Sequence, residues 1–404
     1  MKESAYPACV MRVVIIATIA ALLMLGASAR AQDAKPTPAQ QAQAIVDKAA
    51  AFLKSQQRSD GSLQASPRTP PAVTAMAMQV LAQDPNHGPK HETVRRAVEA
   101  LLKLQKEDGG FYQESLANYN TAIIISGLAS LKDPELKPAI DRAVAFLKGT
   151  QWTDDVVGPD GQKLNPKGVL TGGWFYGGVG ERGGAAADLS NTSVMLDALK
   201  DAGLPEDDPA FQNALKFVTR MQNRSESNPS EWAGNDGGFV YHMRADGTVL
   251  SAAGEESIDG RTVPRSYGSM TYAGFKSLIY AGLTRDDPRV QAAWQWICEN
   301  YTLEENPGMS LASPDRAREG IYYYYSVMAR ALSAYGETTI TDPSGERHDW
   351  RVELIAALAS QQKDDGSFVG ERRWMENDPL IATTLATLAI QEAMADLAAR
   401  PPAD

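Results

Sequence analysis

Apolar residues recur at helical spacing along most of this 404-residue chain. The spacing is clear at Ile45, Ala49, Phe52 and Leu53, which stand at i, i+4, i+7 and i+8 and predict an amphipathic helix. Such stretches form six consecutive pairs: 40–57 with 71–82, 91–105 with 119–131, 138–152 with 190–201, 209–222 with 268–281, 288–301 with 320–335, and 350–362 with 379–395. Repetition at this period predicts one continuous array, because each unit needs a neighbour to cover its apolar face.

The two helices of each predicted pair differ in polarity. First helices carry charges on one face, as at Arg95, Arg96 and Glu99, whereas second helices such as 121–128 are almost uncharged. A helix that is apolar on all sides is buried on all sides. The pattern therefore predicts an all-α fold in which a ring of inner helices lies inside a ring of outer ones.

A glutamine and glycine turn follows the first helix of most pairs. Its best copies are Leu101-x-x-x-Gln105-x-x-Asp108-Gly109-Gly110-Phe111 and Leu358-x-x-x-Gln362-x-x-Asp365-Gly366-x-Phe368. Glycine can adopt the positive φ that ends a helix, and the aromatic residue after it can pack between helices. We expect the glutamine to tie the end of the outer helix to the next turn. The fifth unit departs from the pattern, with Tyr301 in place of the glutamine.

Three insertions interrupt the repeat. The largest, 240–265, contains Asp246-Gly247 between alternating residues and predicts a short β-hairpin. The others are 152–172 and 337–349. Insertions are places where function is often located.

Residues 1–31 resemble a secretory signal peptide. Arg12 precedes an apolar run over 13–25, and Ala29-Arg30-Ala31 supplies small residues for cleavage. We therefore expect a periplasmic or secreted protein without a stable membrane anchor, whether the true start is Met1 or Met11. The expected organisation is a flexible lead at 32–39, the helical array at 40–396 and a tail at 397–404.

The net charge limits the classes of binding partner, and the cysteine content limits disulfide bonding. The formal net charge is −11, which disfavours nucleic acid and anionic membrane surfaces. Removal of 1–31 would leave Cys298 as the single cysteine, so we expect no disulfide within the chain.

The turns around Gln105, Gln222 and Gln362 resemble the glutamine–tryptophan repeats of the terpenoid cyclase and protein prenyltransferase superfamily, which includes squalene cyclases. The resemblance implies an α/α toroid, an α6/α6 barrel of six outer and inner helix pairs, with chemistry in a central cavity. It also implies sites that this chain lacks. The Asp-x-Asp-Asp acid motif of triterpene cyclases is absent. Cys298 lies on a predicted outer helix, and the four histidines (His87, His91, His242 and His348) form no i, i+4 pair within a predicted helix. We expect no zinc site and no cofactor.

Aromatic and polar residues at the predicted starts of inner helices are the candidate ligand-binding set. They are Trp174, Tyr176, Arg265, Tyr267, Tyr272, Tyr322 and Tyr323. Tyrosine can stack and donate a hydrogen bond at once, which suits an isoprenoid, sterol-like or sugar ligand. Their alternative role is to fill the core. Glu319 and Asp188 are the acids best placed for catalysis.

Two hypotheses on function remain open. The first is an exported toroid that binds a hydrophobic, isoprenoid-like molecule or a protein partner in its cavity. The alternative is a divergent enzyme, either cyclase-like or a carbohydrate lyase or hydrolase. A cyclase needs one buried acid facing an apolar pocket, and a carbohydrate enzyme needs two carboxylates about 5–10 Å apart. The sequence does not determine the oligomeric state.

Overall fold

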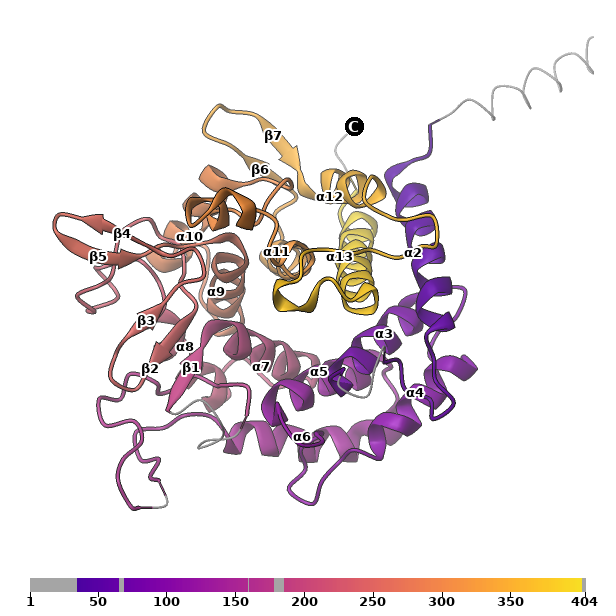
Figure 1. The fold of residues 1–404 in the computed structure, drawn as a ribbon, viewed down its shortest axis with the longest axis horizontal. Coiled ribbons are helices and arrows are strands. Elements are labelled where there is room, and N and C mark those ends of the chain that lie inside the picture. Colours follow the sequence, from indigo (N-terminus) through magenta and orange to yellow (C-terminus); the bar gives the residue numbers. More distant parts are fainter. Residues whose placement is uncertain (1–34, 65–68, 159, 178–184, 402–404) are drawn as a thin grey trace, which may run out of the picture.

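The computed structural model describes residues 35–64, 69–158, 160–177 and 185–401. Within these ranges the chain forms six pairs of helices in two concentric rings (Figure 1). The outer helices are α2 (Pro38–Ser55), α4 (Glu92–Leu102), α6 (Lys137–Gly149), α8 (Pro209–Arg220), α10 (Pro288–Asn300) and α12 (Trp350–Ala359). The inner helices are α3 (Pro71–Gln83), α5 (Ala117–Ser130), α7 (Leu189–Asp201), α9 (Gly268–Tyr280), α11 (Ile321–Tyr335) and α13 (Pro379–Ala399). The predicted α/α toroid is confirmed.

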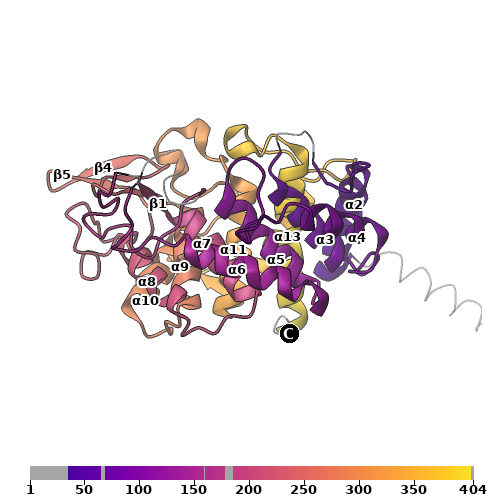
Figure 2. The ribbon, with the colours of Figure 1, turned by 90° about the horizontal axis from the view of Figure 1, so that it is seen from below.

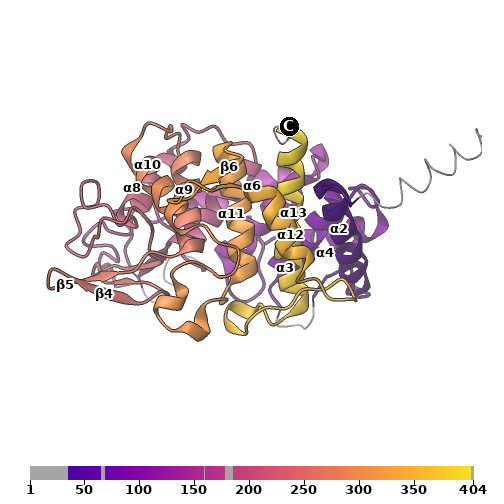
Figure 3. The same cartoon turned by 90° about the horizontal axis from the view of Figure 1, so that it is seen from above.

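Each inner helix packs against the inner helices before and after it, and α13 packs against α3, so the inner ring is closed. In the outer ring, α12 packs against α2. Figures 2 and 3 show that α11 and α13 run along the short dimension of the ring. By length and composition alone α13 could span a membrane, but 67% of its most apolar window is buried inside the ring. Its apolar character follows from that position.

The turn glutamines join neighbouring units. Gln105 Nε2 donates to the carbonyl oxygen of Gly109 in its own turn, at 3.0 Å, and to that of Ala139 in the next outer helix, at 2.8 Å. The other four glutamines, Gln57, Gln151, Gln222 and Gln362, make the same two bonds. The second partner of each glutamine is thus the next outer helix. From the sequence we had expected the next turn.

The turn glycines are required both by their backbone and by space. Gly61, Gly109, Gly172, Gly237 and Gly366 all have φ between +82° and +93°. A Cβ on any of them would overlap a backbone carbonyl oxygen of the next outer helix. Only glycine allows the turn to approach the helix so closely.

A threonine on five of the six inner helices, all except α11, completes the turn. The backbone N–H of Phe111 donates to Thr121 Oγ1 at 2.8 Å, and that of Phe368 to Thr383 Oγ1 at 2.8 Å. Leu63, Trp174 and Phe239 are held in the same way by Thr74, Thr192 and Thr271. These bonds satisfy backbone groups that are buried between helices.

The fifth unit reaches its neighbour by other means. Tyr301, in the place of the glutamine, donates its hydroxyl to Glu353 Oε2 of α12 at 3.0 Å. A direct bond to the next outer helix is therefore kept although the repeat motif is lost.

The insertions form more strand structure than the single hairpin predicted. The expected hairpin exists as β2 (His242–Arg244) and β3 (Val249–Leu250), with Gly247 at φ +89° in its turn. Strand β1 (Ala186–Asp188) extends it to three strands. Two further hairpins, β4 (Glu255–Ile258) with β5 (Arg261–Pro264) and β6 (Thr339–Thr341) with β7 (Arg347–Asp349), lie at the edge of the ring (Figure 1).

The predicted boundaries shift where a cap sets the helix end. Thr37 accepts from the backbone of Gln40 and forms a capping box, so α2 starts at Pro38 and not at residue 40. At its other end the array extends to Ala399, beyond the expected residue 396. The proposed signal segment 1–31 lies outside the described residues, so the division into segments stays a prediction.

Candidate functional site

A cavity of about 280 Å³ lies at the amino-terminal ends of the inner helices. All six of these helices contribute to its wall, through Val73 and Met76, Tyr119, Ser190, Ser269 and Met270, Tyr323, and Ile381 and Leu385. Its described lining contains no lysine or arginine, and Glu376 is its one carboxylic acid. The wall is therefore mostly apolar, with hydroxyl groups as its main polar feature.

Five tyrosines line this cavity: Tyr119, Tyr176, Tyr241, Tyr267 and Tyr323. The hydroxyls of Tyr176 and Tyr241 are 3.2 Å apart, and that of Tyr323 is 2.8 Å from Ser190 Oγ. Burial raises the pKa of all five tyrosines, that of Tyr119 to about 12. All five hydroxyls therefore stay neutral at physiological pH. We name this group and its surroundings the tyrosine cavity.

The insertions place two of these tyrosines. Strand β1 pairs with β2, with Asp188 opposite His242, so Tyr241 enters the cavity wall next to the start of α7. Asn118 at the start of α5 donates its side-chain amide to the carbonyl oxygens of Phe175 and Gly177. Tyr176 is held between them, and its ring centroid is 5.9 Å from that of Tyr119.

Glu376 is a fully buried acid in the wall of the tyrosine cavity. Its Oε1 accepts the backbone N–H of Tyr323 at 2.8 Å, in the first turn of α11. The N-cap of that helix is Gly320, which has no side chain to do this. Burial raises the pKa of the Glu376 carboxyl to about 7, although the backbone N–H groups of α11 oppose the shift. Its Oε2 has no hydrogen-bond partner among the described residues.

Asp188 is the second buried acid at this end of the ring. Its Oδ1 accepts the backbone N–H of Asn191 at 2.7 Å, and Oδ2 accepts the Asn191 side-chain amide at 2.8 Å. Asp188 thus caps α7. Burial raises its pKa to about 7. Both oxygens are already engaged, and the residue is not among those that line the cavity.

Three of the seven predicted ligand-binding residues line the cavity together: Tyr176, Tyr267 and Tyr323. The other four lie outside the lining. Trp174 occupies the aromatic position of the repeat turn, fully buried, with its ring N–H donated to the carbonyl oxygen of Leu147. Tyr272 packs in the core against Tyr324, with ring centroids 5.7 Å apart.

Tyr322 and Arg265 complete that outer set. The Tyr322 ring packs against Phe368, with centroids 5.6 Å apart. Arg265 donates to the carbonyl oxygen of Ala253 at the base of the insertion. Glu319, a candidate catalytic acid, also lies outside the cavity lining. It forms ion pairs with Arg316 at 2.9 Å and Arg373 at 3.2 Å.

Sequence reasoning missed Tyr119, Tyr241 and Glu376. Tyr119 is in the first turn of α5, and Glu376 lies just before the start of α13, so both satisfy the rule that selected Asp188 and Glu319. Tyr241 carries no such signal, since β-strand pairing brings it to the cavity.

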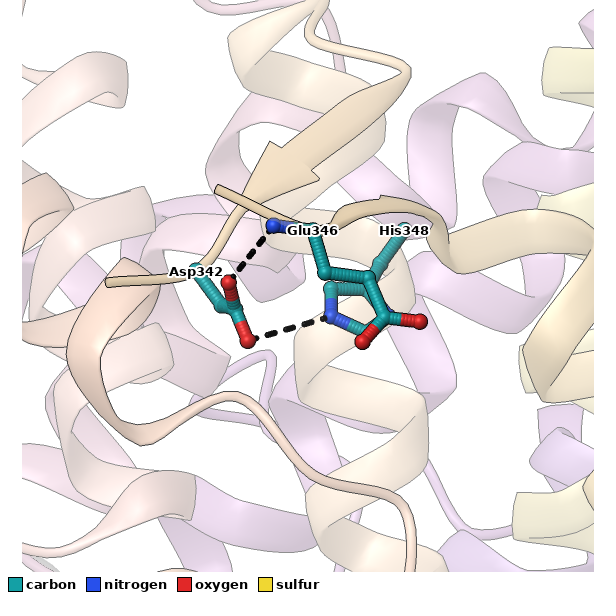
Figure 4. A group of neighbouring side chains, drawn as sticks. All are labelled: Asp342, Glu346 and His348. Atoms are coloured by element: carbon teal, nitrogen blue, oxygen red, sulfur yellow. Dashed lines mark hydrogen bonds and ion pairs between the residues drawn. The ribbon is translucent and has the colours of Figure 1, made fainter. Parts of the chain in front are cut away.

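One group of metal-ligand residue types gathers on the β6–β7 hairpin (Figure 4). Ligand atoms of Asp342, Glu346 and His348 lie within 4.8 Å of one another. Asp342 Oδ1 accepts the backbone N–H of Glu346, and His348 Nδ1 lies 3.0 Å from Glu353 Oε1. The hydrogen bonds of the hairpin and of α12 account for this arrangement. The expectation of no metal site stays a prediction.

Comparison with known proteins gives matches for a segment and for the fold. Residues 62–171 match the family model of the squalene-hopene cyclase C-terminal domain. No curated protein matches the sequence.

Two solved structures illustrate the likeness in fold. A variant of the type II terpene cyclase MstE from Scytonema, in complex with geranylgeranyl dihydroxybenzoate, is 14% identical with a TM-score of 0.54, over 89% of this chain and 99% of that one. An unsaturated glucuronyl hydrolase specific for heparin is 14% identical with a TM-score of 0.58, over 89% and 97%. At such identity the likeness concerns the fold alone. One segment of the chain is thus similar to the squalene-hopene cyclase C-terminal domain, and the chain as a whole has the α/α toroid fold of these solved structures.

Proposed function

We propose that the protein binds a small, neutral, apolar molecule of isoprenoid type in the tyrosine cavity. The observation that carries this proposal is the wall itself, whose described residues are mainly apolar side chains and five neutral tyrosines, with no cation among them. Apolar walls with a few convergent polar groups are typical of small-molecule sites. The solved cyclase variant of similar fold, in complex with geranylgeranyl dihydroxybenzoate, supports a ligand of this type.

The volume of the tyrosine cavity and the carboxyl group of Glu376 further restrict the kind of ligand that we expect. A cavity of about 280 Å³ is near the lower limit of about 300 Å³ for small-molecule pockets, which favours a short isoprenoid. A carboxyl whose pKa is raised to about 7 is partly protonated at neutral pH and can then donate a hydrogen bond. Glu376 would therefore favour a ligand with an alcohol or carbonyl oxygen.

Farnesol, a neutral isoprenoid alcohol, is a suitable probe in a calorimetric titration. Met270→Trp fills the cavity and should abolish binding. Leu311→Trp adds the same side chain at a site that is 66% exposed, and should bind like the wild type. Absence of binding to the wild type, or equal binding by both variants, would count against the proposal.

Acid-initiated chemistry on a neutral isoprenoid is the second candidate function. It is favoured by Glu376, a buried acid with an unpartnered oxygen in an aromatic cavity, which is the arrangement that a cyclase-like enzyme needs. Glu376→Gln should then retain ligand binding but lose conversion of the ligand. The carbohydrate alternative finds less support, because the described lining has one carboxylic acid and not two.

We also propose that the protein is exported, on the strength of the signal-like segment 1–31. Mass spectrometry of the protein from its native cells should give an amino terminus close to residue 32. An intact amino terminus on protein from the cytosolic fraction would contradict this.

A further inference from the structure

A second and larger cavity, of about 650 Å³, lies at the opposite end of the ring. Five inner helices line it with residues near their carboxyl-terminal ends: Gln83 of α3, Ser130 of α5, Asp201 of α7, Tyr280 of α9 and Ser333 of α11. None of its described lining residues is shared with the tyrosine cavity. We name it the polar cavity.

An ion-pair network stands in its wall. Arg330 Nη2 donates to Asp201 Oδ1 at 2.6 Å, and Arg330 Nε lies 2.9 Å from Asp197 Oδ1. Behind it, Lys276 Nζ donates to Asp197 Oδ2 at 2.6 Å, with 2% of its side chain exposed. Burial opposes the charge on Arg330, yet Asp197, Asp201 and Glu392 raise its pKa well above the usual range. Arg330 therefore stays charged.

The carboxylate groups of Asp201 and Glu392 can each accept further hydrogen bonds. Asp201 Oδ2 is buried and has no hydrogen-bond partner among the described residues. Glu392, half-buried in the wall, forms no hydrogen bond or ion pair within the described chain. The cations beside them are engaged, since Arg330 is paired and Lys200 donates to Glu206 at 2.9 Å. Lys132 is exposed at the surface.

The backbone also contributes negative electrostatic potential to the polar cavity. Helix carboxyl termini carry partial negative charge and stabilise cations, and five of them meet here. The one aromatic ring of the described wall, Tyr280, already has the ammonium groups of Lys200 and Lys276 over it, at 5.8 and 5.9 Å. The helix ends and the two carboxylates, and not this ring, favour ammonium groups over anions.

From this geometry we propose that the polar cavity is a binding site for a small organic cation, an aliphatic amine of several atoms. The volume exceeds what a bare metal ion needs, and the amide and hydroxyl groups of Gln79, Gln83 and Ser126 can accept hydrogen bonds from N–H groups. The ammonium groups would meet Asp201 and Glu392. The proposal does not depend on the function of the tyrosine cavity.

Calorimetric titration with spermidine at low ionic strength tests the site. We expect one spermidine per chain, with binding at least tenfold weaker in Glu392→Gln. Because Glu392 forms no hydrogen bond or ion pair within the described residues, this variant should unfold close to the wild-type temperature. Glu255→Gln removes the same charge from the exposed strand β4 and should bind like the wild type.

Three results would overturn the proposal: no binding of spermidine, equal weakening by Glu392→Gln and Glu255→Gln, or binding of citrate in place of spermidine. Equal weakening would mean that the amine is attracted by overall charge alone. As a second variant, Asp201→Asn should also weaken binding, and Met270→Trp in the tyrosine cavity should leave it unchanged.

Discussion

The side-chain amide of Gln362 donates a hydrogen bond to the carbonyl oxygen of Ile45, 2.9 Å away and 317 positions earlier in the chain. The same bond links four other pairs of consecutive units, and here it joins the last unit to the first. One residue type thus builds the array and also closes it.

Gln362→Ala should reduce the free energy of unfolding by about 1–3 kcal/mol. The substitution removes both bonds of the amide and leaves the carbonyl oxygens of Ile45 and Gly366 without this donor. Urea unfolding followed by circular dichroism measures the change. Gln113→Ala, at an exposed position, is the control and should change stability by less than about 0.5 kcal/mol. Equal losses in the two variants would show that the closing bond contributes nothing.

Gly366→Ala should destabilise the protein far more than Gly345→Ala. Both glycines have positive φ, +86° and +89°, so both variants carry a similar backbone penalty of about 1 kcal/mol. A Cβ at Gly366 would also overlap the carbonyl oxygen of Lys48, whereas nothing lies within 4 Å of one at Gly345. We expect a further loss of about 2 kcal/mol or more, by the same unfolding measurement. Similar stabilities of the two variants would show that the turn can move away from α2 at little cost.

Thr121→Val should cost about 1–3 kcal/mol although the two side chains have nearly the same shape. The hydroxyl is the acceptor for the buried N–H of Phe111, and valine leaves that donor unpaired. Thr121→Ser keeps the hydroxyl and should recover most of the loss. Thermal unfolding of the three proteins separates the two effects, and a serine variant as unstable as the valine variant would contradict this role.

Glu376 should make stability fall as the pH rises. Its pKa is about 7 in the folded protein, against roughly 4.3 in an unfolded chain. Between these values the folded state binds more protons, so the stabilisation is complete below about pH 4 and is lost by about pH 7. The difference in unfolding free energy between wild type and Glu376→Gln should therefore drop by roughly 2–4 kcal/mol over this range. Urea unfolding at a series of pH values measures it. Glu371→Gln, at an exposed position, should show no such drop, and a flat difference for Glu376→Gln would contradict the raised pKa.

The fold could be predicted because its determinants are local and repeated. The glutamine, the glycine and the aromatic residue recur at fixed spacing, and the polarity of 121–128 against that of Arg95, Arg96 and Glu99 separates the inner helices from the outer ones. The bonds between units could not be derived in detail, since nothing in the sequence says which carbonyl oxygen Gln105 meets.

The candidate site was only partly accessible from sequence. Tyr176, Tyr267 and Tyr323 were found because inner-helix starts converge in a toroid. Tyr241 reaches the cavity through strand pairing in an insertion, which no periodicity predicts. Trp174 could not be told from a ligand-binding residue, since the same side chain at the same position serves the turn.

The ring described above has no structural beginning. An open stack of repeats can fray from its two ends, whereas here α2 and α12 are as much neighbours as any two consecutive outer helices. The chain termini therefore lie at one of six joints around the ring, of which five are made by a turn glutamine and one by Tyr301. A permuted gene that links the present ends and opens the ring elsewhere should encode the same molecule, with both cavities intact.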